Sequence, residues 1–454
     1  MIRHALWPLA IALPVVIAGC ASGPRAEQTL RVVAEDGETR VAVDSLTTEY
    51  DVEGLRVIQR GVYSSDVVAV RLYLLGGVRQ LTPATQGIES MLLEASSYGS
   101  ARYPRAAMRA AVGRTGSGVG FDADMDWSVY QFHGLRQAFD STWAVWADRL
   151  LHPTLDSASV ELVRSRMIRS AARRRTSPDA HVYYLADSLA FAGHPYALHP
   201  SGIESSLAAI TDEALRRYHR EQLVTSRMLL VVVGNVPRGT VEGAVRRTFG
   251  TLPRGSYVWT MPEPVAVPPR GAVLEQRSTP TNYLLGLFDG PPATSPDHPA
   301  FEMALAILSS RLYVAVRDER GLSYSASAPF LDRALTGGGV SVTTSAPETV
   351  VKVIREQMRL LRAEGVPAMN VQRFVEHWTR DYFETHATSA AQASYLGRSQ
   401  LLLGDWRKGV ERIEALRAVR STDLRRVSMR YMRDIRFAYV GDTTKVDRKE
   451  LMRF

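Results

Sequence analysis

Short segments rich in β-branched and aromatic residues recur along the chain, and longer segments of helical periodicity separate them. The clearest strand-like pairs are residues 55–59 with 67–75 and residues 272–276 with 282–288. Each pair precedes an apolar segment long enough for a helix, at residues 86–97 in the first half and 299–318 in the second. Because strands and helices do not alternate strictly, the pattern predicts the α+β class.

The same order of segments occurs twice. Gly234 and Gly441, each of which ends a strand-like run late in its half, are 207 positions apart. Pro153 and Pro367, each at the start of a long helical segment, are 214 positions apart. Repeats of this length indicate duplicated domains rather than the units of a solenoid.

We therefore predict two homologous lobes, each of mixed, largely antiparallel sheet packed with helices. The first lobe is expected over residues 45–252 and the second over residues 270–454. A proline-rich stretch at residues 253–269 is the expected linker. A chain of this length is also too long for one hydrophobic core.

The first twenty residues predict export and membrane attachment. Arg3 precedes an apolar run that is too short to span a bilayer, which is typical of a secretory signal. The run ends in Ile17-Ala18-Gly19-Cys20, which resembles a bacterial lipobox with a lipidated cysteine. Residues 1–20 are then a lipoprotein signal peptide and residues 21–44 a tether. The alternative is an ordinary signal peptide with an incidental cysteine.

The residue after Cys20 indicates the cellular location of the chain, and the composition limits the classes of partner that it can bind. Ala21, rather than an aspartate, favours the bacterial outer membrane, with the lipid-anchored chain facing the periplasm. Cys20 is the only cysteine, so the mature chain has neither disulfides nor a cysteine-based zinc site. The net charge of +8 comes from scattered basic residues without interleaved aromatics, which disfavours nucleic acid as a partner.

One predicted helix carries six arginines with no acidic residue among them. They are Arg164, Arg166, Arg169, Arg173, Arg174 and Arg175. Such a run is usually a solvated face. In a closed chamber it would form a basic wall that favours acidic peptides or an acidic partner surface.

Motifs in both halves carry a resemblance to a known family. They are Phe191-Ala192-Gly193-His194-Pro195-Tyr196, Ile210-Thr211, Val231-Val232-Val233-Gly234 and Arg317-Asp318-Glu319-Arg320-Gly321-Leu322-Ser323-Tyr324. Together they resemble the pitrilysin/insulinase-type zinc peptidases, a family that includes mitochondrial processing peptidase. The resemblance extends over roughly residues 50–445 and implies the two-lobed clam-shell fold of these peptidases. It also implies that Arg317 and Tyr324 contact the substrate backbone near the cleaved bond.

Active members of this family carry H-x-x-E-H on a first-half helix, where two histidines bind zinc and the glutamate is the general base. In the equivalent stretch of this chain, Ser90 and Glu94 occupy the histidine positions, and Leu93 replaces the base. Ala172 stands at the position of the downstream glutamate ligand. The resemblance therefore implies no metal ion or other cofactor in this chain.

Active relatives also hold the substrate along an edge strand of the first half. The pair of residues that forms main-chain hydrogen bonds to the peptide corresponds here to Gly120 and Phe121. Glycine weakens a strand but permits close approach of another backbone. A modified binding edge and a degenerate loop are both compatible with this sequence.

The loss of the metal ligands and the retention of Arg317 and Tyr324 favour a non-catalytic subunit of a two-chain zinc metallopeptidase. The chain would bind unfolded peptides, and the pair would assist in trans at the zinc of a homologous partner subunit. The alternative function is an outer-membrane scaffold or peptide-binding protein with no peptidase partner. In a purely structural role, Arg317 would cap a helix end and Tyr324 would be half-buried before a strand.

Overall fold

The computed structural model describes residues 33–35, 38–40, 46–264 and 270–454. The predicted signal peptide with Cys20 and most of the predicted tether lie outside the described residues. Within the tether, β1 (Val33–Glu35) and β2 (Glu38–Arg40) form an antiparallel pair. This pair belongs to a small unit of its own, and residues 44–454 form the second unit, which contains two six-stranded sheets.

The first sheet has the strand order β3-β4-β8-β5-β7-β6 and is antiparallel except between β4 and β8. Its strands are β3 (Thr47–Val52), β4 (Leu55–Arg60), β5 (Val67–Leu75), β6 (Gly118–Ala123), β7 (Trp127–Leu135) and β8 (Met228–Val233). Every residue of β8 is buried, and alternate residues enter two different core clusters. The central strand is therefore covered on both faces, which explains its uninterrupted apolar sequence.

The second sheet has the order β11-β13-β10-β14-β9, with β12 paired to β13 outside this path. Its strands are β9 (Gly271–Gln276), β10 (Asn282–Asp289), β11 (Ser325–Ser327), β12 (Phe330–Leu331), β13 (Gly337–Thr344) and β14 (Arg436–Gly441). As in the first sheet, one parallel pair, β14 with β9, stands among antiparallel neighbours. The two sheets and their helices confirm the predicted α+β class.

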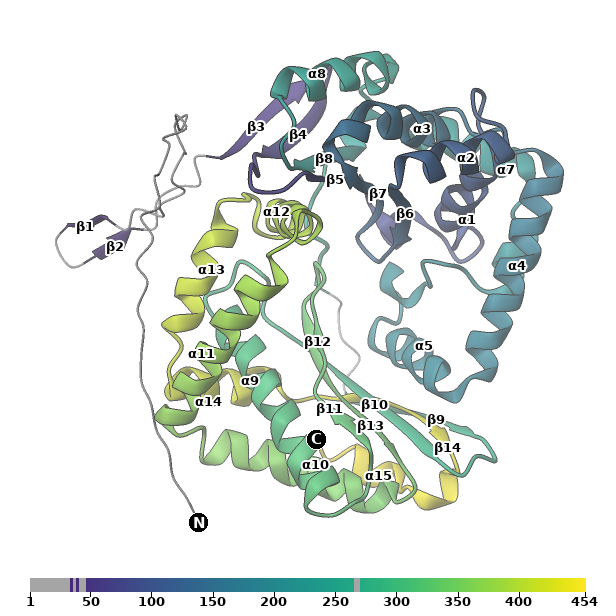
Figure 1. Cartoon of the computed structure of the whole chain (residues 1–454). Helices are drawn as coiled ribbons and strands as arrows, with labels where there is room; N and C mark the ends of the chain where they lie inside the picture. The colour runs from purple at the N-terminus through teal and green to yellow at the C-terminus, as the bar shows by residue number, and fades with distance from the viewer. Residues whose placement is uncertain (1–32, 36–37, 41–45, 265–269) are drawn as a thin grey trace, which may run out of the picture. The chain divides into compact units, whose positions relative to one another are not determined.

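Helices follow the strands in a similar order in each half (Figure 1). The first half contains α1 (Ile88–Ala95), α2 (Arg105–Thr115), α3 (Phe139–Leu151), α4 (Ser157–Thr176), α5 (Pro178–Ala190), α6 (Glu204–Ala209), α7 (Asp212–Gln222) and α8 (Arg238–Arg247). The second half contains α9 (His298–Leu312), α10 (Pro347–Ala363), α11 (Ala368–Thr385), α12 (Ser389–Leu403), α13 (Lys408–Arg417), α14 (Ser421–Tyr431) and α15 (Arg448–Leu451).

Each half contributes one helix to the sheet of the other half. Helix α5 packs on β9, β10 and β14, and Val182 of α5 shares a buried cluster with Ala438 and Val440 of β14. Helix α12 packs on β5 and β8, and Leu396 of α12 shares another cluster with Tyr73 of β5 (Figure 1). Because burial of apolar surface is the main stabilising term in folding, neither sheet reaches its full burial without the other half.

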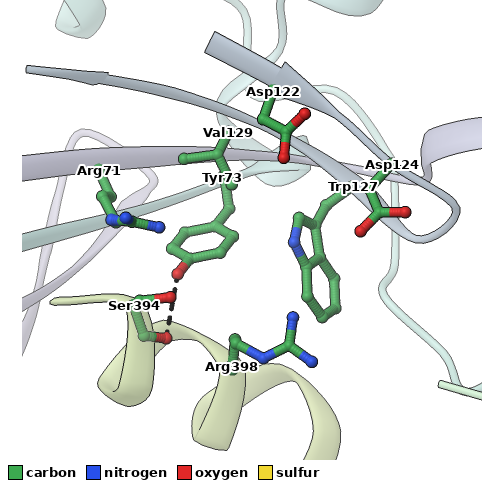
Figure 2. A pocket seen from close by; sticks show the side chains of 8 residues that line it. All are labelled: Arg71, Tyr73, Asp122, Asp124, Trp127, Val129, Ser394 and Arg398. Atoms are coloured by element: carbon green, nitrogen blue, oxygen red, sulfur yellow. Dashed lines mark hydrogen bonds between the residues drawn. The ribbon is translucent and has the colours of Figure 1, made fainter. Parts of the chain in front are cut away.

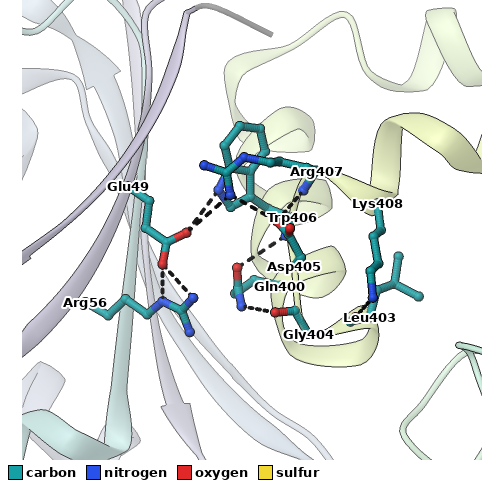
Figure 3. Close-up of polar contacts among 9 residues, drawn as sticks. All are labelled: Glu49, Arg56, Gln400, Leu403, Gly404, Asp405, Trp406, Arg407 and Lys408. Atoms are coloured by element: carbon teal, nitrogen blue, oxygen red, sulfur yellow. Dashed lines mark hydrogen bonds and ion pairs between the residues drawn. The ribbon is translucent and has the colours of Figure 1, made fainter. Parts of the chain in front are cut away.

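A polar contact adds to the packing of α12 (Figure 3). The Glu49 carboxylate of β3 accepts a hydrogen bond of 2.6 Å from Arg56 and one of 3.2 Å from the indole of Trp406. Arg407 lies 3.9 Å from the same carboxylate. The Gln400 side chain accepts a hydrogen bond from the Trp406 backbone amide and fixes the turn after α12.

The described part of the predicted linker, residues 253–264, is held against the body. The Trp259 indole donates a 2.9 Å hydrogen bond to the Leu401 carbonyl and lies 5.1 Å from the Arg79 guanidinium. Tyr257 and Trp259 both pack against the cluster beneath α12. The linker is thus part of the contact between the halves, and residues 265–269 lie outside the described residues.

Among the described residues, the helical segment His298–Asp318 is long and apolar enough to cross a membrane by length and composition. Its side chains Met303, Leu305 and Leu308 are buried in the core cluster of the second half. A central helix of a folded core has the same composition as a membrane span, and the burial here fits the core helix.

We predict that Gly397→Ala destabilises the fold. A Cβ atom at Gly397 of α12 would lie 2.3 Å from the ring of Tyr73, which is fully buried and donates a hydrogen bond to the Ser394 carbonyl. We expect the free energy of unfolding to decrease by about 1–3 kcal/mol in chemical denaturation.

Gly113→Ala on α2 is the matched control, because no atom lies within 4 Å of a Cβ atom there. We expect no loss and up to about 1 kcal/mol of gain from helix propensity. If both variants lose a similar free energy of unfolding, the close contact between α12 and β5 does not cause the effect of Gly397→Ala.

Candidate functional site

A buried charge pair fixes helix α1 against the first sheet. The Glu89 carboxylate, which is 3% exposed, is ion-paired with Arg227 and accepts hydrogen bonds from the hydroxyls of Ser128 and Tyr218. Arg227 also donates a 2.6 Å hydrogen bond to the Leu75 carbonyl. Burial, followed by the nearby Glu89 carboxylate, raises the pKa of Tyr218 well above its usual value, so this hydroxyl stays a donor. Both oxygens of the Glu89 carboxylate are thereby engaged.

The start of α1 depends on a close approach between two loops. Gly87 caps the helix at a φ of 92°, and a Cβ atom there would lie 2.8 Å from the Cα of Gly202. Both conditions require glycine. This contact and the Glu89 pair determine which face of α1 turns outward.

The outward face of α1 lines a cavity of about 340 Å³ together with α4 and β6. Its lining residues are Ser90, Glu94, Phe121, Arg166, Met167, Ser170, Arg173, Arg174 and Ser201. The structure therefore brings together three of the residues predicted from the sequence: Ser90, Glu94 and Phe121. Leu93 is fully buried in the core of the first half instead, and Ala172 is half-buried on α4 without lining the cavity. The serine two positions earlier, Ser170, faces the cavity in its place.

The groups around this cavity do not fit zinc. The Glu94 carboxylate is ion-paired with the Arg166 guanidinium, and the other ionisable lining groups are the guanidiniums of Arg173 and Arg174. Zinc requires histidine, cysteine or carboxylate ligands, and the serine hydroxyls here do not replace them. Within residues 46–264 and 270–454, no cluster of three or more His, Cys, Asp or Glu residues could hold a metal ion.

Strand β6, which carries Gly120 and Phe121, is the edge of the first sheet. It pairs with β7, where Gly120 lies opposite Gln131 and Phe121 opposite Tyr130. No described strand pairs with its other side. No atom lies within 4 Å of a Cβ atom at Gly120, so the face of the strand is uncovered at this residue. The segment is thus a regular strand rather than a degenerate loop.

Arg317 and Tyr324 lie side by side after α9. Helix α9 continues into a π-helical segment, Tyr313–Asp318, a geometry often found at functional sites. The Arg317 guanidinium lies 4.3 Å from the ring centroid of Tyr324 and 4.7 Å from that of Tyr313, whose hydroxyl accepts its hydrogen bond. Gly321, at a φ of 59°, reverses the chain between the two residues. Tyr324 is 82% exposed, which excludes the half-buried role considered from the sequence.

Two further cavities were not foreseen from the sequence. One, of about 420 Å³, is lined mainly by apolar and aromatic parts of α4, α5 and residues 197–205. The other, of about 150 Å³, lies between β5–β7 and α12 and contains both acidic and basic groups, including Asp122 and Arg398 (Figure 2). Because the smaller cavity joins segments far apart in the chain, no local pattern identifies it.

We predict that zinc affinity can be restored only from the residues that face the cavity. A variant with Ser90→His, Glu94→His, Ser170→Glu and Arg166→Ala presents two imidazoles and a carboxylate and removes a repelling charge. We expect it to bind zinc, in competition with a chromophoric chelator, at least about tenfold more tightly than the natural chain.

The matched variant carries Ala172→Glu in place of Ser170→Glu. We expect weaker binding, because Ala172 does not line the cavity. Equal affinity of the two variants, or tight zinc binding by the natural chain, would contradict the arrangement of α4 described above.

Comparisons with known proteins agree with this fold and site. A sequence model of the insulinase family (peptidase family M16) matches residues 56–200, and one of the peptidase M16 inactive domain matches residues 209–376. The zinc protease YmxG of Bacillus subtilis is 22% identical over 384 residues, which cover 81% of this chain and 90% of that protein. A probable mitochondrial-processing peptidase subunit beta of Schizosaccharomyces pombe is 22% identical over 194 residues, 43% of this chain and 42% of that protein.

Among solved structures, a peptidase M16 inactive domain from Pseudomonas fluorescens superposes with a TM-score of 0.81 at 17% sequence identity. The match covers 87% of this chain and 98% of that one, so it shows the shared fold. The family resemblance seen in the sequence is confirmed. The chain belongs to the insulinase family, peptidase family M16, as an inactive-type member without the H-x-x-E-H motif.

Proposed function

We propose that the chain is the non-catalytic subunit of a two-chain zinc metallopeptidase. The observation that carries this proposal is the contact between Arg317 and the exposed Tyr324, in a chain whose metal position holds an arginine–glutamate ion pair. Membership of the family suggests a homologous peptidase as the partner, and one relative is itself named as a peptidase subunit. In this proposal zinc is bound by the partner.

The pair is suited to act on a peptide bond that another chain cleaves. The Tyr324 hydroxyl can donate to the oxyanion that develops on the scissile carbonyl, and Arg317 can donate to a neighbouring peptide carbonyl. Within the described residues, Arg317 forms no ion pair, so its charge is available to a substrate. The guanidinium of Arg317 contacts the rings of Tyr313 and Tyr324, and these contacts hold it in place before substrate binds. Zinc in the partner would supply the Lewis acid that activates water.

The first half offers the place for an unfolded peptide. An extended segment can add to the free side of β6, where main-chain hydrogen bonds bind any sequence. Phe121 of β6 also lines the 340 Å³ cavity, so a peptide on this edge lies next to it. In this proposal the first half binds the peptide, and the second half stabilises the transition state.

We predict that the purified chain cleaves no peptide and that activity appears when it is mixed with its zinc-bearing homologue. Tyr324→Phe removes the donor to the oxyanion without changing the ring, so kcat of the mixture should decrease by about 100-fold or more. Arg317→Ala should decrease kcat/KM, because substrate also loses a contact in the ground state. Rates on an unfolded peptide and the affinity of the two subunits are the measurements.

Tyr63→Phe and Arg109→Ala are the controls, since both residues are exposed and neither is part of the proposed site. Neither control should change the rate. If both active-site variants retain full activity in the mixture, the Arg/Tyr pair has no role in trans. If pull-down from membranes recovers no zinc-bearing homologue, the scaffold function replaces the subunit function.

We also propose that a lipid on Cys20 anchors the chain to the outer membrane, facing the periplasm. The support is the lipobox-like end of the N-terminal segment. Cys20→Ala should leave no lipidated residue, so we predict that the exported chain moves from the membrane pellet to the soluble fraction after cell fractionation. Mass spectrometry of the natural N-terminus should detect acyl groups on Cys20. An unmodified N-terminus at another residue would contradict the proposed anchor.

A further inference from the structure

The cavity at the degenerate metal position has an excess of positive charge. Its lining contains the guanidiniums of Arg166, Arg173 and Arg174 and one carboxylate, that of Glu94. Arg166 and Glu94 form an ion pair. Arg173 and Arg174 form no ion pair with any described residue, although Arg175, the next residue of α4, pairs with Glu204. Two positive charges of the cavity thus have no counterion in the described part of the chain.

Arg174 is the more restricted of the two. It is half-buried, and its guanidinium donates a 2.5 Å hydrogen bond to the Gly202 carbonyl. It also lines the neighbouring, mainly apolar cavity of about 420 Å³, where water solvates a charge poorly. Burial accordingly lowers the pKa of the Arg174 guanidinium. A carboxylate within reach would offset the free energy of desolvating this cation.

The neutral polar groups of the cavity are also donors. The hydroxyls of Ser90, Ser170 and Ser201 line it, and none of them forms a hydrogen bond with another described residue. Guanidiniums and hydroxyls together present many donors to one small volume, which matches a group with acceptors only. An ionised carboxylate is such a group, and its hydrogen bonds to guanidinium are among the strongest in proteins.

We propose that this cavity binds the side-chain carboxylate of a glutamate or aspartate in an extended peptide. Phe121 and Met167 provide apolar lining for the methylene groups of such a side chain, and the arginines and serines surround its head. Phe121 belongs to the open edge strand β6, where successive side chains of an added strand point alternately toward and away from the cavity. The inference rests on the proposed peptide binding but needs no partner subunit.

The test compares two peptides on the isolated chain. One is a fluorescently labelled, unfolded peptide of about ten residues with a single glutamate, and the other has glutamine at that position. A charge-assisted hydrogen-bonded contact predicts about tenfold to hundredfold tighter binding of the glutamate peptide by fluorescence anisotropy. Equal affinities would overturn the proposal.

Variants of the cavity sharpen the test. Arg173→Gln with Arg174→Gln should abolish the preference for glutamate, whereas Arg169→Gln should retain it, because Arg169 is exposed on the same helix and does not line the cavity. Glu94→Gln should strengthen binding of the glutamate peptide, because it removes a negative charge and frees Arg166. A purely structural role of these residues predicts no such gain.

The outcomes separate this inference from the proposed function. If the double variant does not fold, as judged by circular dichroism, Arg173→Gln alone decides, since Arg173 is exposed. Retained glutamate preference in that folded variant, together with no gain in Glu94→Gln, would overturn the inference. Reconstituted cleavage without any glutamate preference would sustain the subunit function and reject the anion site. If the chain prefers the glutamate peptide but no peptidase partner is found, the anion site is retained and the subunit function is rejected.

Discussion

The buried ion pair of Glu89 with Arg227 is the constraint on which the site depends. Two charges in a core are tolerated only when they are paired and hydrogen-bonded, and loss of one partner costs about 3–5 kcal/mol. Here the hydroxyl of Tyr218 and the Leu75 carbonyl complete the hydrogen bonding. Since Glu89 faces inward, its neighbour Ser90 faces the cavity, and the orientation of the whole helix follows. Together with the close approach of Gly87 and Gly202, this pair determines which side chains of α1 line the cavity.

The reciprocal packing of α5 and α12 gives the two halves a common stability. Each central strand, β8 and β14, has one face covered by its own half and the other by a helix of the opposite half. A change at this contact therefore affects both sheets. The described linker residues Tyr257 and Trp259 pack against the same cluster as α12. The halves form one compact unit in residues 44–454, although their strand order reflects a duplication.

The sequence predicted the features that are encoded locally and missed those created by tertiary contact. The strand patterns and the spacing of Arg317 and Tyr324 depend on nearby residues, and the duplicated order follows when these local patterns are compared along the chain. The fold class follows from both. The family resemblance implied that Ala172 of α4 stands at the downstream ligand position, whereas the helix turns Ser170 toward the cavity. The Arg166–Glu94 ion pair joins residues 72 positions apart, which no helical or strand period can indicate. Glu89 carried a usable signal, because a carboxylate within an apolar helix requires a buried partner.

A cavity lined by arginines acts on a bound peptide in a different way from a zinc ion. A zinc ion acts on the scissile carbonyl, so its interaction strengthens in the transition state and accelerates the reaction. A guanidinium fixed on α4 acts on a side chain that does not react, so its interaction is equal in the ground and transition states and contributes to selection only. The exposed Tyr324 has the opposite property, because an oxyanion exists only while the bond is being broken. Separation of these two tasks onto different halves allows specificity to change at Arg173 and Arg174 without altering the groups that stabilise the transition state.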